Sequence, residues 1–342
     1  MKRFRLVLAT AAAVAVALAP GVATAWGTHG HHLINHVAAA SFPKAMPAFT
    51  RSADAVYEIT MLGSFMDDLK GSGESWDEDF DPGHYLDLAD NGTIAGVVNI
   101  NALPDSRAAY GVALNAANTT AARMGYLPYS ILDGWEQVRR DFAYWRVADY
   151  RAAHGATAAA RSKALHARMV WQAIVLRDIG VWGHFLGDGS QPLHVTLHYN
   201  GWGSGPNPDG FTTKHGIHSY FENHFVNAHA TEAAVAALIK PTTIQPTSTL
   251  ISQPAMLTRI AAYLTTTNSF VPQVYRLDKS GAFRAATPTA ITFTDERLAF
   301  GAAELRDLTL LAWYDSLNSG VGYPEYTVRS ILNGHPQRAP RS

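Results

Sequence analysis

The chain has 342 residues and nearly balanced charge, with 27 Lys and Arg residues against 28 Asp and Glu residues. This balance argues against the broad basic surface of most DNA-binding domains, although it leaves a nucleic-acid substrate open, because bound metal ions would add positive charge locally. Cysteine is absent, so disulfides are excluded and a zinc site has to be built from His, Asp and Glu; 15 histidines are available for it.

The N-terminus has the pattern of a cleaved export signal. A short basic segment ends at Arg5, an apolar run covers 6–18, and small residues at 23–25 suit a signal peptidase. Because the apolar run is too short to span a bilayer comfortably, we expect a signal peptide over 1–25 rather than an uncleaved membrane anchor. The mature chain would begin at Trp26, be secreted or periplasmic, and carry 24 basic residues, since the leader holds three of the 27.

Helical periodicity dominates the rest of the chain. Apolar residues recur at three- and four-residue spacing, and good helix formers fill these stretches. The expected helices cover 30–41, 105–124, 129–153, 158–187, 216–238, 255–275 and 294–317. Strand patterns are scarce, with 97–100 as a weak candidate, and the main loops are expected over 70–83, 88–104, 198–215 and 239–254. The sequence therefore predicts an all-α protein with a single domain over 26–342.

The segment HFLGDGSQPLH at 184–194 is the strongest chemical signal. His184 and Asp188 lie four positions apart, hence on one face of the expected helix. The helix is expected to stop or bend at Gly187, Gly189 and Pro192. Such a bend would turn His194 back toward the same side. Because the flanking residues are apolar, we expect these ionisable groups to face inward.

A second pair of imidazole and carboxylate follows. His218 and Glu222 are again four positions apart, on a helix that opens near Gly216. Helical bundles build internal metal sites from such pairs, and nitrogen with carboxylate oxygen suits zinc. One pair alone would more often be a hydrogen-bonded couple without metal. Two pairs with a further histidine between them favour a metal site, because buried carboxylates need a partner.

Further candidate ligands lie upstream. Signal cleavage would expose the α-amine of Trp26, a nitrogen ligand once deprotonated, and the carbonyl of the same residue can chelate the same ion. His31 follows in the segment WGTHGH, Asp67 lies in SFMDDLK, and His84 begins HYLD. Each of these is a weak signal when it is taken alone.

The chain resembles the phospholipase C/P1 nuclease superfamily at motifs that run in order over 26–222: WGxxGH, Asp67, His84, HFLGDxxQPLH and HSYFE. Beyond this range only the helical character agrees. Members of that superfamily are all-α enzymes that hold three zinc ions in a cleft and hydrolyse phosphate esters. The resemblance therefore implies a fold of this type, three Zn²⁺ as cofactors and phosphodiesterase activity.

The resemblance also implies the ligands of each ion. The first zinc would be held by Asp67, His84, His184 and Asp188. The second would be held by the amine and carbonyl of Trp26, by His31 and by Asp188 as a bridging carboxylate. The third would be held by His194, His218 and Glu222. A zinc-bound hydroxide at the first two ions is the implied nucleophile, which Asp67 is expected to orient, while the third ion stabilises the departing oxygen.

The substrate expected from the resemblance is single-stranded DNA or RNA, together with 3′-nucleotides, cleaved to 5′-phosphorylated products. Lys70 lies where the nucleases have a cation that contacts the phosphate, although a solvated loop lysine is the alternative. Tyr85 and Asp87 match positions at which nucleases stack a base and hydrogen-bond its edge, with core packing as the alternative for Tyr85. We expect a monomer without a stable protein partner.

Two other functions stay open at this point. Glu222 stands where the nucleases usually have aspartate, and HSYFENHFV is close to the phospholipase form of that helix. A phospholipase C acting on phosphatidylcholine-type lipids is therefore the alternative within the same chemistry. A non-catalytic zinc-binding interaction protein is the alternative from another class.

The interval between His84 and His184 is longer than in either group of the superfamily. We place an insertion at about 88–157. Its helical residues, 126–146 among them, are expected to form a lid or a specificity surface.

Overall fold

The computed structural model describes residues 26–203 and 205–339, and these are predominantly helical, which confirms the all-α prediction. The predicted signal peptide over 1–25 lies outside the described residues. The longer helices are α1 (Gly27–Ala40), α2 (Ala53–Met61), α4 (Arg107–Asn115), α6 (Leu127–His154), α7 (Ala158–Ser190), α11 (Gln253–Asn268), α12 (Val271–Lys279) and α13 (Pro288–Asp315). None of the described helices combines the length and apolar character needed to cross a membrane.

Short elements fill the connections. The short helices are α3 (Asp77–Phe80), α5 (Ala121–Met124), α8 (Ile217–Ser219), α9 (Val226–His229), α10 (Glu232–Ala237) and α14 (Val328–Leu332), and a π-helix covers Tyr220–Phe225. The 3-10 turns lie at Ala48–Arg51, Leu62–Ser64, Asp67–Leu69, Asp81–His84, Ile100–Ala102 and Pro192–His194. Two antiparallel hairpins pair β1 (Thr93–Ile94) with β2 (Val98–Asn99) and β3 (Gly320–Val321) with β4 (Tyr326–Thr327). The weak strand signal at 97–100 thus corresponds to β2.

Three of the expected long helices are interrupted, each for a local reason. Asn118 takes a left-handed conformation (φ 53°) and separates α4 from α5. Thr231 is extended and its side chain accepts a hydrogen bond from the Ala234 N–H, so that α10 begins as a new helix. Pro272 lies in the first turn of α12, where its missing N–H is tolerated.

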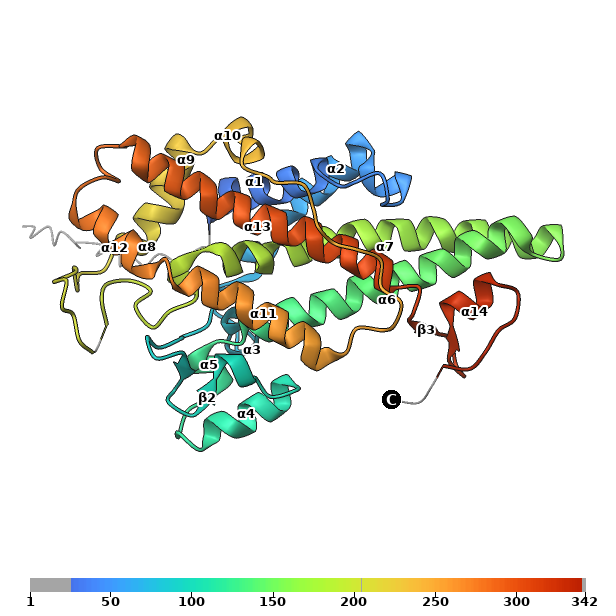
Figure 1. The fold of residues 1–342 in the computed structure, drawn as a ribbon, viewed down its shortest axis with the longest axis horizontal. Coiled ribbons are helices and arrows are strands. Elements are labelled where there is room, and N and C mark those ends of the chain that lie inside the picture. Colours follow the sequence, from blue (N-terminus) through green and yellow to red (C-terminus); the bar gives the residue numbers. More distant parts are fainter. Residues whose placement is uncertain (1–25, 204, 340–342) are drawn as a thin grey trace, which may run out of the picture.

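Helices α6 and α7 form a long antiparallel pair that is central to the fold and extends beyond the other helices in Figure 1. Trp135 and Phe142 of α6 and Trp182 of α7 are fully or almost fully buried in the main core. The Trp182 indole also donates a hydrogen bond to the carbonyl of Ile131 at 2.9 Å, which joins the two helices. These residues lie mainly in α6, a helix of the core, so the expectation of a lid is wrong. A specificity surface, the other role expected for 126–146, stays a prediction.

Helix α7 continues as far as Ser190, so the expected break at Gly187 and Gly189 is wrong; the helix ends before Pro192. The glycines instead allow close packing. A Cβ at Gly183 would lie 2.1 Å from Oδ1 of Asn35, and a Cβ at Gly187 would lie 2.8 Å from Nδ1 of His31. Because both contacted residues belong to α1, the missing side chains let α1 approach α7 closely enough to bring His31 beside it.

Candidate metal centre

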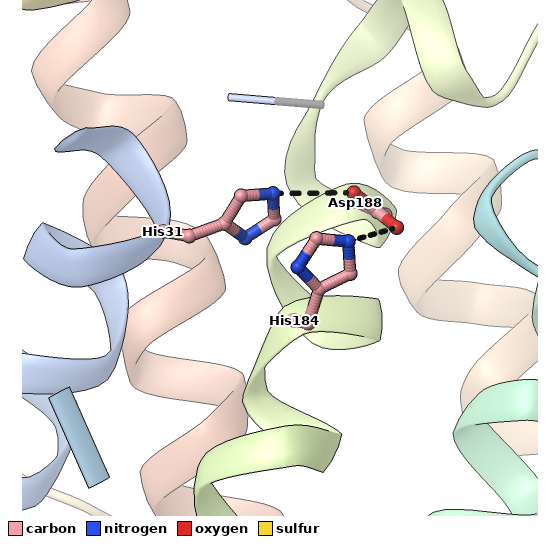
Figure 2. Close-up of side chains that lie close together, drawn as sticks. All are labelled: His31, His184 and Asp188. Atoms are coloured by element: carbon pink, nitrogen blue, oxygen red, sulfur yellow. Dashed lines mark ion pairs between the residues drawn. The ribbon is translucent and has the colours of Figure 1, made fainter. Parts of the chain in front are cut away.

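His31, His184 and Asp188 come together where α1 lies against α7. Figure 2 shows both imidazoles directed toward the Asp188 carboxylate, one from each helix. Nε2 of His31 lies 3.5 Å from Oδ1 of Asp188, and Nε2 of His184 lies 3.4 Å from Oδ2. All three side chains are fully buried, so the carboxylate is shared between two imidazoles away from water.

A second group adds residues from the loops that precede α6. Asp67 and His84 belong to consecutive 3-10 turns, and together with His184 they form a cluster with metal-ligand spacing. Oδ1 of Asp67 lies 3.7 Å from Nε2 of His184, and Nδ1 of His84 lies 2.9 Å from the same nitrogen. The other ring nitrogen of His184 is 2.8 Å from the Gly63 carbonyl, which fixes the ring so that Nε2 faces the cluster.

The third group consists of His194, His218 and Glu222. Nε2 of His218 lies 2.8 Å from Oε2 of Glu222, and Nε2 of His194 lies 3.6 Å from the same oxygen. Each imidazole is oriented through Nδ1 by a backbone carbonyl, that of His84 for His194 (2.8 Å) and that of Tyr199 for His218 (3.0 Å). Glu222 lies in the π-helix, an irregularity that often accompanies functional sites.

Several polar atoms in these groups are buried without a hydrogen-bond partner among the described residues. They are Nδ1 and Nε2 of His31, Nε2 of His84, Oδ1 of Asp188 and Nε2 of His194. Burying such atoms unsatisfied is costly, and in native proteins they are nearly always paired. Imidazole nitrogens with carboxylate oxygens are a donor set that suits zinc, so the residues present fit the metal that the resemblance implies.

The electrostatics of the cluster favour the ligand form of the imidazoles of His31, His84 and His184. Burial, together with the charge of neighbouring imidazoles and of a nearby ammonium, holds the pKa values of His31, His84 and His184 well below the usual histidine range. Burial raises the pKa of Asp188 well above that of an ordinary carboxyl. At Glu222 burial acts in the same direction, but His218 and His194 outweigh it and lower the pKa to about 2. Neutral histidines are ready to coordinate a cation without first losing a proton.

Trp26 lies fully buried at the start of α1. Its indole N–H donates hydrogen bonds to the Gly187 carbonyl and to Oγ of Ser190, each at 2.9 Å. These bonds hold Trp26 against the end of α7, beside the cluster. The Trp26 carbonyl accepts a hydrogen bond from the Gly30 N–H at 3.1 Å. Ligation through the amine and carbonyl of Trp26 stays a prediction.

A pocket of about 300 Å³ opens beside the cluster. Its lining consists of Lys70, Asp81, His84, Tyr85, Asp87, Arg123, Leu193, His194, Tyr199 and His218. The residues expected from the sequence to contact substrate, Lys70, Tyr85 and Asp87, therefore share one pocket with ligand candidates of the second and third groups. Nζ of Lys70 lies 2.8 Å from Oδ1 of Asp67, which links the pocket to the cluster.

Sequence reasoning missed four residues of this pocket: Asp81, Arg123, Leu193 and Tyr199. Asp81 and Leu193 lie close to expected ligands in the sequence and could have been found by proximity. Arg123 and Tyr199 carry no motif, and only the fold brings them to the pocket.

Burial raises the pKa of Asp87 to about 7 and that of Tyr85 to about 12, so the tyrosine stays neutral in the physiological range.

No protein-family model matches the chain, and no curated protein matches it either. Of the nine expected metal ligands, the eight that act through side chains fall into three compact groups, which are His31, His184 and Asp188; Asp67, His84 and His184; and His194, His218 and Glu222.

Proposed function

We propose that this protein is a zinc-dependent phosphodiesterase of the phospholipase C/P1 nuclease superfamily, and specifically a nuclease that cleaves single-stranded DNA and RNA to 5′-phosphorylated products. One observation carries the proposal: buried, unpartnered imidazole and carboxylate atoms from distant parts of the chain converge beside a pocket that also contains Lys70 and Tyr85. A purely structural cluster would not need an opening lined with a cation and an aromatic ring.

Asp67, His84, His184 and Asp188 would hold the first ion, and Trp26, His31 and Asp188 would hold the second. The third would be held by His194, His218 and Glu222. Bound zinc supplies an acidified water and positive charge toward phosphate oxygens near neutral pH. The chain's own contribution is orientation. Gly63, His84 and Tyr199 direct the ligand imidazoles through their carbonyls, and Asp67 holds the Lys70 ammonium in the pocket lining, where it can bind a phosphate oxygen.

The pocket walls favour a nucleic-acid substrate. The Tyr85 hydroxyl donates a hydrogen bond to the carbonyl of Ala122 at 3.1 Å, which anchors the far end of the ring. An aromatic face held in this way can stack on a base whatever its identity. Asp87 lies in the same pocket with a pKa of about 7, so that its carboxyl can hydrogen-bond a base edge.

The experiment compares three substrates with purified mature protein: a single-stranded oligonucleotide, a 3′-mononucleotide and phosphatidylcholine vesicles. We expect oligonucleotide cleavage with 5′-phosphate ends, measured by end analysis, and loss of activity on chelation with recovery on adding zinc. Turnover of phosphatidylcholine alone would contradict the nuclease proposal and support the phospholipase, which Glu222 favours. Binding of zinc without turnover of any phosphodiester, bis(p-nitrophenyl) phosphate included, would support a non-catalytic role.

A matched pair of variants tests the role of the cluster. Asp67→Asn removes the carboxylate that faces His184 and Lys70, and we expect it to abolish phosphodiester turnover with the circular dichroism spectrum unchanged. Asp68→Asn changes the exposed neighbour in the same turn and should retain turnover. Full activity of Asp67→Asn would contradict the proposed first zinc site.

A further inference from the structure

Arg123 stands out among the pocket residues because it comes from the segment between the hairpin β1–β2 and α6, far in sequence from the ligand motifs. It lies on α5, and its side chain is exposed. Within the described part of the chain, no carboxylate forms an ion pair with its guanidinium and no acceptor takes a hydrogen bond from it. An arginine that lines a pocket without an internal partner leaves its donors available to a ligand.

Hydrogen bonds hold the backbone around Arg123 against the segment that follows His84. The Asp87 N–H donates to the Met124 carbonyl at 2.8 Å, and the Tyr85 hydroxyl donates to the Ala122 carbonyl at 3.1 Å. These two bonds flank Arg123 on both sides in the sequence. Helix α5 is therefore positioned by the same residues that form the pocket wall.

Gly125 makes this close approach feasible. It has a φ of 76°, and a Cβ at this position would lie 2.0 Å from the Tyr85 carbonyl oxygen. The Tyr110 hydroxyl donates to the Gly125 carbonyl at 2.9 Å, so α4 supports the turn from behind. The turn after α5 is thus fixed on two sides, and the placement of Arg123 at the pocket is built into the fold.

The groups that line the pocket indicate the class of ligand. Lys70 forms an ion pair with Asp67 of the metal cluster, whereas the Tyr85 hydroxyl is bonded to the carbonyl of Ala122, the residue before Arg123. The pocket therefore combines an aromatic ring with two cations, one joined to the metal cluster and one on α5. A single nucleic-acid strand likewise combines bases with successive phosphates. A phosphatidylcholine headgroup would bring its own cation toward Arg123, which is unfavourable.

We propose that Arg123 binds the phosphate adjacent to the scissile one, so that this enzyme prefers strands with at least two phosphates over substrates with one. The inference rests on the proposed nuclease function and adds a second phosphate subsite to it. The guanidinium suits this role because its planar array of donors can hold phosphate oxygens in pairs.

The test uses a thymidine dinucleotide with one internal phosphate and the same dinucleotide carrying a second phosphate at its 5′ or its 3′ end. For the wild type we expect kcat/KM to be about tenfold higher on one of the two-phosphate substrates than on the one-phosphate substrate. In Arg123→Ala this preference should disappear through a higher KM, whereas Arg123→Lys should keep part of it. The preference should also weaken as salt is added, because it depends on a phosphate contact.

Arg140→Ala is the matched control, since it removes an exposed arginine that does not line this pocket. It should show the wild-type preference. An unchanged preference in Arg123→Ala would overturn the proposal, and so would an equal loss of kcat/KM on all three substrates. A wild type that cleaves none of them would contradict the nuclease function itself, which is a different result from a nuclease that is indifferent to the second phosphate.

Discussion

The imidazoles of His31 and His184 stack face to face, with ring centroids 3.9 Å apart and planes at 15°. Two charged imidazoles would repel each other at this distance, and their surroundings hold the pKa values of both rings well below the usual range, with burial as the largest cause. Each ring is therefore favoured in its neutral form, in which one nitrogen keeps a lone pair that can bind a cation. Both rings face the Asp188 carboxylate, as Figure 2 shows.

Metal removal should destabilise the fold. The unpartnered nitrogens and oxygens of the cluster are buried, and a bound cation would satisfy them. We expect calorimetry to show a fall in Tm of at least about 5 °C when the zinc-loaded protein is treated with a chelator, reversed by added zinc. Magnesium added instead of zinc serves as the control. Identical melting curves with and without chelator would contradict a buried metal centre.

Gly187→Ala should displace His31. The new methyl group would lie 2.8 Å from Nδ1 of His31, and neither α1 nor α7 can easily retreat from a fully buried contact. We expect a loss of about 1–3 kcal/mol in the free energy of unfolding, together with less bound zinc by elemental analysis. Gly111→Ala is the control, because a Cβ there meets nothing within 4 Å and the helix should gain stability. Equal zinc content in both variants would argue against His31 as a ligand.

A residue added before Trp26 should remove one of the three proposed ions. Extension converts the α-amine into an amide, which no longer offers a nitrogen lone pair to a metal. We therefore expect elemental analysis to find one zinc fewer per chain, with most of the phosphodiesterase activity lost. The same addition at the C-terminus controls for the tag. Full zinc content in the N-terminally extended protein would show that the Trp26 amine is not a ligand.

Asp141 should make stability fall as pH rises. This carboxyl is fully buried in α6, and burial together with the neighbouring Asp178 raises its pKa to about 8. The folded chain thus keeps a proton on Asp141 that the unfolded chain releases near pH 4. The stabilisation by this protonated carboxyl is complete below about pH 4 and is lost by about pH 8.

Urea unfolding at several pH values measures this effect. The free energy of unfolding of Asp141→Asn should rise relative to that of the wild type between about pH 5 and about pH 8, because the amide does not ionise. Asp149→Asn changes a half-exposed carboxyl of the same helix that pairs with Arg168, and its free energy of unfolding should follow the pH dependence of the wild type. A constant difference between wild type and Asp141→Asn would disprove the shifted titration.

The sequence by itself determined the all-α fold and the side chains of the cluster. The spacing of four between His184 and Asp188, and again between His218 and Glu222, is a local property of the helix, so the pattern could be read without knowing the fold. The early helix was also expected, at 30–41 against the observed Gly27–Ala40. What local spacing could not determine is which segments meet.

Tertiary structure decided the rest. Gly187 was expected to bend α7, but its missing side chain instead makes room for His31, a packing contact between residues far apart in the chain. Residues 126–146 were expected to form a lid or a specificity surface, and their apolar side chains place them in the core, which excludes the lid. Arg123 has no motif at all and reaches the pocket only through bonds to residues after His84. Such contacts depend on the shapes of two segments that are far apart in the chain. The local pattern of one segment gives no information about the segment that packs against it.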